Sequence, residues 1–156
     1  MILDISSYNG VIDWNTVTKK NQIDRVILRA TTKNGKLDTK FLANYKALKA
    51  LKVPIDIYKF SYATDAQSAF SECDNVIFEM ERNKIEFDML WLDIENDGAL
   101  RWTKKRAFDV ICGYMACLRL DYTTLGIYCN LDYYKSVIPE PFKTKLPLWI
   151  ARWTSG

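Results

Sequence analysis

The stretch MLWLDIE, residues 89–95, is a short apolar run that ends in two carboxylates. Successive side chains of a strand point to opposite faces, so Trp91, Asp93 and Glu95 share one face. Leu92 and Ile94 share the other, which we expect to pack against helices. In α/β architectures, reactive groups gather at the carboxyl ends of parallel strands. This stretch therefore predicts both a buried parallel strand and a candidate site at its end.

Five more apolar runs rich in Ile, Val, Leu, Tyr and Trp flank this stretch, with helical patterns between them. The alternation predicts a parallel sheet with helices outside, either open or curled into a barrel. In the helix expected near 65–82, the apolar spacing places Phe70, Cys73, Ile77 and Met80 on one side. The other helices are expected from Asp38, near 101–118, and after Trp14 and Leu131. The six predicted strands are 2–6, 25–31, 53–62, 89–95, 124–130 and 146–153.

The composition excludes several classes of function. The 156 residues suit one domain, and the net charge of +3 is too small to indicate nucleic acid as a partner. No apolar run reaches the roughly 18 residues of a membrane helix. The chain has no histidine, which excludes Ser-His-Asp and Cys-His catalysis and histidine-ligated zinc. No glycine-rich nucleotide loop follows a strand, which argues against a nucleotide site. We expect neither a cofactor nor a metal.

The four cysteines contain no CxxC pair. They fall within apolar helix and strand patterns, which favours reduced core thiols, with disulfides as the alternative. They are Cys73, Cys112, Cys117 and Cys129.

Asp93 and Glu95 are the main candidates for chemistry. Two carboxylates two residues apart on a strand have Cβ atoms roughly 6–7 Å apart. Rotation of the side chains can bring the two carboxyl groups to the separations that paired-carboxylate glycosidases use. Close like charges also push two pKa values apart, so one group can stay protonated near neutral pH. A solvated acidic rim, a metal site or salt-bridge partners are the other interpretations of the pair.

Further polar and aromatic residues lie on the other predicted strands. Asp4 and Asp56 lie within apolar runs, which is costly unless they are paired or catalytic. Arg29 could pair with either. Asn130 ends the fifth predicted strand. Aromatic side chains could form the wall of a glycan cleft, although each one alone is more typical of a core: Tyr58, Phe60, Trp91, Tyr128, Trp149 and Trp153.

Several segments, kept in order along the whole chain, resemble glycoside hydrolase family 25, the lysozymes of phage endolysins and of bacterial or fungal muramidases. The resemblance implies a compact, irregular β/α barrel that hydrolyses the β-1,4 bond between N-acetylmuramic acid and N-acetylglucosamine. The matching segments are residues 4–10 (DISSYNG), 12–14 (IDW), 26–30 (VILRA), 57–60 (IYKF), 91–95 (WLDIE), 126–130 (GIYCN) and 147–153 (PLWIARW).

The resemblance also implies roles for residues. Glu95 is expected to be the general acid/base, and Asp93 to assist by orienting the N-acetyl group of the substrate as it attacks the anomeric carbon. Asp4 is expected to line the same cleft and to help set the charge on the pair. The residues expected to bind substrate are Tyr58, Phe60, Trp91, Tyr128, Asn130, Trp149 and Arg29.

The chain departs from the family pattern in three respects. The family usually has a small residue at Asp56 and often histidine at Lys59. Its barrel also continues for two strands past 149–153, the last of which brings another active-site aspartate. We therefore expect residues 1–156 to form a single catalytic domain of six strands, incomplete at its C-terminus and without a wall-binding module. A second chain or a partner segment could complete the barrel.

The resulting functional expectation is a peptidoglycan hydrolase, a phage or prophage endolysin whose partner is the bacterial wall. No signal peptide precedes the first strand, so synthesis in the host cytoplasm and action after release are expected. A family 18 chitinase is disfavoured, because it requires the longer motif DxxDxDxE. A non-catalytic or inactivated glycan-binding barrel fragment is the remaining alternative.

Overall fold

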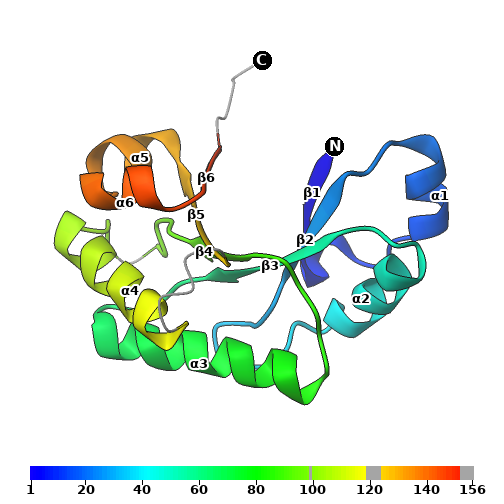
Figure 1. The fold of residues 1–156 in the computed structure, drawn as a ribbon, viewed down its shortest axis with the longest axis horizontal. Helices are drawn as coiled ribbons and strands as arrows, with labels where there is room; N and C mark the ends of the chain where they lie inside the picture. Colours follow the sequence, from blue (N-terminus) through cyan, green and yellow to red (C-terminus); the bar gives the residue numbers. More distant parts are fainter. Residues whose placement is uncertain (99, 119–123, 152–156) are drawn as a thin grey trace.

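The computed structural model describes residues 1–98, 100–118 and 124–151. Six strands form one parallel sheet whose order follows the chain, and the sheet curls into a half-barrel with helices outside (Figure 1). The fold class expected from the sequence is thus confirmed. The strands are β1 Ile2–Ile5, β2 Arg25–Arg29, β3 Ile55–Phe60, β4 Leu90–Asp93, β5 Leu125–Asn130 and β6 Leu148–Ala151.

The helices follow the strands as connecting segments. Three of them depart from the predicted pattern. The helix expected from Asp38 begins at Phe41, and neither the short 3-10 helix η1 nor α6, which has Pro141 in its first turn, was predicted. No helix in the described part of the chain is long and apolar enough to cross a membrane. The helical segments are η1 Ser7–Asn9, α1 Trp14–Lys20, α2 Phe41–Ala50, α3 Ala66–Arg82, α4 Lys104–Cys117, α5 Leu131–Ser136 and α6 Glu140–Lys145.

Short polar side chains fix where several helices begin. Asp13, Asp65 and Thr103 each accept a hydrogen bond from a backbone N–H in the first turn of α1, α3 and α4. Such caps satisfy N–H groups that have no partner inside the helix. The cap at Asp13 sets the start of α1 at Trp14.

The buried side of α3 differs in part from the expected one. Cys73 and Met80 are buried as predicted, but Phe70 is 44% exposed. Ala69 and Val76 are fully buried in its place. At Ala69, α4 approaches so closely that a Cβ atom at Gly113 would lie 2.7 Å from the Ala69 Cβ atom, which leaves no room for a large side chain at that point.

The two faces of the sheet have different roles. On the convex face, alternate residues such as Leu28, Ile57, Leu92 and Ile127 are completely or almost completely buried beneath the helices. On the concave face, neighbouring strands place their side chains in rows. One row is Arg29, Tyr58, Trp91 and Gly126, and the next is Phe60, Asp93, Tyr128 and Trp149.

Asp56 belongs to the concave face and is buried. Its carboxylate accepts hydrogen bonds from Arg25 Nη1 at 2.5 Å, from Trp91 Nε1 at 2.9 Å and from the Met89 backbone N–H at 3.1 Å. The pairing with Arg29 considered from the sequence is wrong, because Arg25 lies beside Asp56 instead. Each buried N–H that loses its acceptor has a substantial energetic cost.

We expect Asp56→Ala to lower the free energy of unfolding by about 3 kcal/mol, because two N–H donors lose their acceptor and Arg25 keeps only Asp88 as an ion-pair partner. Urea unfolding followed by far-UV circular dichroism measures the change. Asp56→Asn retains an acceptor and is expected to cost less. Equal stability of wild type and Asp56→Ala would contradict this role.

Candidate active site

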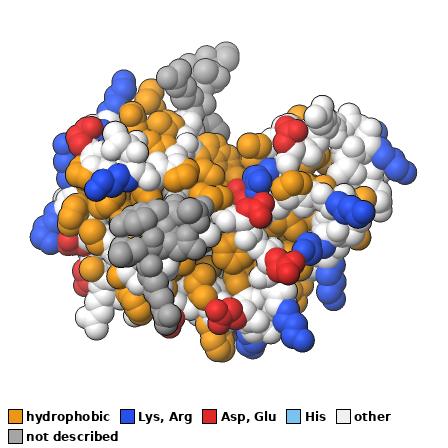
Figure 2. All heavy atoms as spheres, viewed as in Figure 1, with side chains coloured by type: hydrophobic (Ala, Val, Ile, Leu, Met, Phe, Trp, Pro, Cys, Tyr) orange, Lys and Arg blue, Asp and Glu red, His pale blue; other side chains and the backbone are white. Residues whose placement is uncertain are grey.

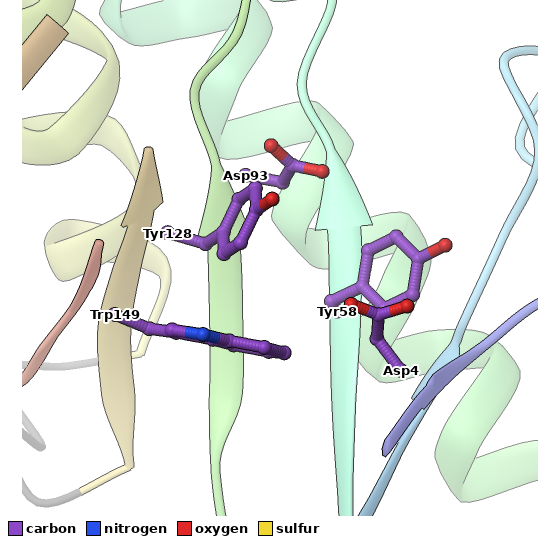
Figure 3. Close-up of a pocket in the computed structure, with 5 residues that line it drawn as sticks. All are labelled: Asp4, Tyr58, Asp93, Tyr128 and Trp149. Carbon is purple, nitrogen blue, oxygen red and sulfur yellow. The ribbon is translucent and has the colours of Figure 1, made fainter. Parts of the chain in front are cut away.

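A cavity of about 110 Å³ opens on the concave face of the half-barrel. Its lining consists of Asp4, Tyr58, Asp93, Tyr128 and Trp149, which come from five different strands. In Figure 3, Asp4 and Tyr58 lie on one side of the cavity, Tyr128 and Trp149 on the other, and Asp93 between them. The half-barrel therefore brings together residues far apart in the chain, all of them named as site candidates from the sequence.

Asp93 is the most perturbed acid of the cavity. It ends β4 and its side chain is almost fully buried, and no hydrogen-bond partner among the described residues reaches its Oδ1 atom. Burial raises the pKa of Asp93 to about 9, with further contributions from the charge of Glu95, a hydrogen bond to Glu95 and the charge of Asp4. Asp93 is therefore protonated at neutral pH.

Glu95 lies just beyond β4, which ends two residues earlier than predicted. The backbone pairing continues as far as Ile94, whose N–H donates to the Tyr128 carbonyl at 2.9 Å. Glu95 is half-buried and contacts Asp93, although it is not part of the cavity lining. The two carboxyl groups therefore form a pair in which Glu95 is the more accessible member.

Asp4 is exposed on β1 at the open side of the cavity, so the predicted cost of burying it does not arise. Its alternative role as an ion-pair partner of Arg29 is wrong. Arg29 pairs with the buried Asp38 at 2.6 Å and donates to Ser7 Oγ at 2.7 Å. The negative charge of Asp4 consequently remains available to the cavity, where it helps to raise the pKa of Asp93.

Aromatic rings form one wall of the cavity. The Trp149 ring meets Tyr128 edge-on at 4.9 Å between centroids and Trp91 at 5.9 Å. Burial raises the pKa of Tyr58 to about 12 and also raises that of Tyr128, so both hydroxyls stay protonated as hydrogen-bond donors. Figure 2 shows hydrophobic side chains gathered in the hollow between the two ends of the molecule, with charged groups among them. Such a wall suits a sugar, which has an apolar ring face and polar hydroxyls.

The remaining predicted substrate residues lie beside the cavity rather than in its lining. Phe60 packs against Tyr62 at 5.0 Å between ring centroids. The Asn130 side chain accepts a hydrogen bond from the Tyr133 N–H and so caps α5. Arg29 lies under the exposed Tyr8 ring, 4.9 Å from its centroid. Trp153, also considered for the aromatic wall, is outside the described residues.

The model of glycosyl hydrolases family 25 matches residues 3–156. The chain belongs to this family.

Solved structures agree with this assignment. The autolysin LytC from Streptococcus pneumoniae, determined with a synthetic peptidoglycan ligand, has a TM-score of 0.87 and 25% identity. The match covers 99% of this chain and 38% of LytC. The Clostridium perfringens spore cortex lytic enzyme SleM has a TM-score of 0.77 and 24% identity, with 96% of this chain and 52% of SleM covered.

A muramidase from Trichobolus zukalii has a TM-score of 0.78 and 19% identity, with 98% of this chain and 77% of that chain covered. The chain thus corresponds to only part of the two longer proteins, 38% of LytC and 52% of SleM. None of the curated protein sequences compared with the chain matches it.

One departure from the family 25 pattern has a clear structural basis. Lys59 stands where the family often has histidine, and its side chain points to the convex face, where it is buried. Its Nζ donates to the Thr32 carbonyl at 2.7 Å, and burial lowers its pKa. Lys59 thus supports the loop after β2 and is not part of the cavity lining.

Arg106, which was not among the candidates from the sequence, supports the segment after Glu95. Its guanidinium lies 3.8 Å from the Trp102 ring centroid and donates to Asp97 at 3.2 Å and to the Ala63 carbonyl at 2.9 Å. The basic run 104–106 gave no indication of this, since such runs are usually solvated. The available signal was the spacing of Trp102 and Arg106, which are four residues apart, as in one turn of a helix.

Gly126 makes room for the Trp91 ring beneath Trp149. A Cβ atom at residue 126 would lie 2.5 Å from the nearest ring carbon of Trp91. We expect Gly126→Ala to displace the indole, to disturb Trp149 and to raise KM on glycan chains about tenfold, because a displacement near 1 Å at a binding wall is costly. Steady-state kinetics with intrinsic tryptophan fluorescence tests this. Gly10→Ala, at a φ of 69° and with open space around the added Cβ atom, is the control that strains the backbone without a clash at the cavity. An unchanged KM in Gly126→Ala would contradict the prediction.

Proposed function

We propose that this chain is the catalytic part of an N-acetylmuramidase that hydrolyses the β-1,4 bond between N-acetylmuramic acid and N-acetylglucosamine in peptidoglycan. The observation that carries the proposal is the Asp93–Glu95 pair, which holds a proton at neutral pH beside an aromatic cavity. Membership of family 25 and the likeness to LytC support it.

The pair supplies both the proton and the orientation that the reaction needs. Glu95, the more accessible carboxyl, delivers a proton to the glycosidic oxygen. Two coupled carboxyls titrate as one unit and share the proton. Transfer of the proton from Asp93 to Glu95 therefore restores the protonated form of Glu95. Asp93 then holds the N-acetyl group of the substrate against the anomeric carbon.

The closeness of the two carboxyls favours this substrate-assisted route. A carboxylate nucleophile normally stands about 5–5.5 Å from the acid, and a base that activates water stands about 6.5–9.5 Å away. Asp93 and Glu95 are in hydrogen-bonding contact, which is closer than either arrangement. The acetamido oxygen of the sugar itself is therefore the better nucleophile.

Digestion of purified peptidoglycan tests the proposal. We expect new reducing-end muramic acid, identified by mass spectrometry after borohydride reduction. New reducing-end N-acetylglucosamine would instead indicate a glucosaminidase. Tight binding to wall sacculi without any new reducing ends, by a folded protein, would support the glycan-binding alternative and overturn the enzymatic one.

The biological setting is part of the same proposal. We propose a phage or prophage endolysin made in the host cytoplasm and acting on the wall after release. An autolysin of the bacterium itself is the alternative, because LytC is one. In the described part of the chain β1 and β6 are each paired on one side, and a second chain or a further segment pairing there is proposed to complete the barrel.

A further inference from the structure

Helices α3 and α4 approach each other very closely. A Cβ atom at Gly113 of α4 would lie 2.7 Å from the Ala69 Cβ and 2.4 Å from the Ala66 carbonyl oxygen of α3. Both helices follow strands of a parallel sheet on its convex side, so they run in the same direction (Figure 1). Residues four positions further along each helix therefore lie one turn higher on the same contact line.

Those residues are Cys73 on α3 and Cys117, the last residue of α4. The two thiols lie near enough for each to affect the pKa of the other. Burial raises the pKa of both thiols, while their interaction opposes the rise at Cys117 and adds to it at Cys73. Cys117, the less buried of the two thiols, is therefore the sulfur that more readily carries the negative charge.

Only one member of this cysteine pair is accessible from solvent. Cys73 is fully buried, whereas Cys117 is half-buried and borders a surface hollow. The same hollow is lined by the acidic residues Asp74 and Glu81 and by apolar side chains, Phe78 among them. A small reagent can reach Cys117 from this hollow, and the acidic side chains favour a positively charged one.

We infer that Cys73 and Cys117 form an oxidisable pair that small cationic disulfides convert into a disulfide bond linking α3 to α4. The Cys117 thiolate attacks one sulfur of the reagent, forms a mixed disulfide and releases one thiol. Cys73 then loses its proton and attacks the Cys117 sulfur, and the second reagent thiol leaves. The protein loses two hydrogen atoms, and the reagent is reduced to two thiols.

Cystamine, which is a dication, and glutathione disulfide, which is an anion, are the matched reagents. We expect cystamine to react about tenfold faster at low ionic strength, and added salt to narrow the difference. Intact mass should fall by two hydrogen atoms, and peptide mapping should join the peptides that contain Cys73 and Cys117. The bond is expected to raise Tm by roughly 5–10 °C, because it closes a long loop in the unfolded chain.

Two variants complete the test. Cys112→Ser, on the same helix, is expected to behave as wild type. Cys73→Ser is expected to stop at the mixed disulfide on Cys117, which adds one cysteamine to the mass. In the wild type, a lasting mixed disulfide, a bond that involves Cys112 or Cys129, or no reaction at alkaline pH would overturn the inference. Because none of these readouts uses hydrolysis, the result is independent of the proposed activity.

Discussion

Replacing Glu95 by glutamine is expected to lower the turnover number on peptidoglycan by about 10²–10⁴-fold. Glutamine keeps the shape of the side chain but carries no transferable proton, and it cannot accept the proton that Asp93 holds. Since Glu95 is half-buried and lies beyond the end of β4, the fold should tolerate the change. Release of reducing ends from sacculi measures the loss, and circular dichroism verifies folding.

Glu86→Gln is the matched control for this experiment. Glu86 is exposed and pairs with Lys49 at 2.6 Å, outside the cavity lining. The control is expected to retain full activity. If Glu95→Gln cleaves peptidoglycan as fast as Glu86→Gln, then Glu95 is not the general acid and the proposed mechanism fails.

Asp93→Asn is expected to have opposite effects on activity and stability. Activity should fall about 10²–10³-fold, because the variant loses the group that reloads Glu95 and orients the substrate. The free energy of unfolding should rise by about 1–3 kcal/mol at neutral pH, because asparagine is neutral in both states, whereas the Asp93 carboxyl must take up a proton when the chain folds. A stability gain with lost activity is typical of a residue kept for function.

The stability gain is expected to depend on pH. The folded protein holds a proton on Asp93 up to about pH 9, whereas the unfolded chain releases it near its ordinary pKa of about 4. The free energy of unfolding contributed by this group is therefore complete below about pH 4 and is lost as the pH rises through 9. The advantage of Asp93→Asn over wild type should grow across that interval.

Thermal unfolding at a series of pH values checks this dependence. Asp132→Asn is the contrasting control, because a hydrogen bond from Arg101 lowers the pKa of Asp132, which is exposed. Its stabilising contribution is present at neutral pH and is lost on acidification, the reverse of Asp93. A stability difference between Asp93→Asn and wild type that shrinks on going from acid to alkaline pH would contradict the assignment.

The sequence predicted the features that depend on local periodicity. Strand alternation correctly placed Trp91 and Asp93 on the concave face and Leu92 in the helix-covered core. The six strands were found because each is a compact apolar run. Their ends were less accurate, since runs such as 53–62 continue past the residues that form ladder hydrogen bonds.

The partners of charged residues were not predictable in the same way. Arg29 pairs with Asp38, which lies in the loop after β2. Asp56 instead pairs with Arg25 of the neighbouring strand β2. Several pairings satisfy the same charges in the sequence, and only the path of the loops selects one. The thiol contact between Cys73 and Cys117 was hidden for a related reason, because it depends on how closely Gly113 lets two helices approach.

The order of the strands across the sheet is also their order along the chain. No strand has to be inserted between two that are already paired, and each new strand adds to the exposed edge of the one before it. Assembly can therefore proceed vectorially during synthesis, starting at the N-terminal strand, with each helix covering the growing sheet as it leaves the ribosome. Asp93 and Glu95 would reach their place beside Tyr58 before β5 and β6 supply Tyr128 and Trp149, so the acids are set before the aromatic wall closes around them.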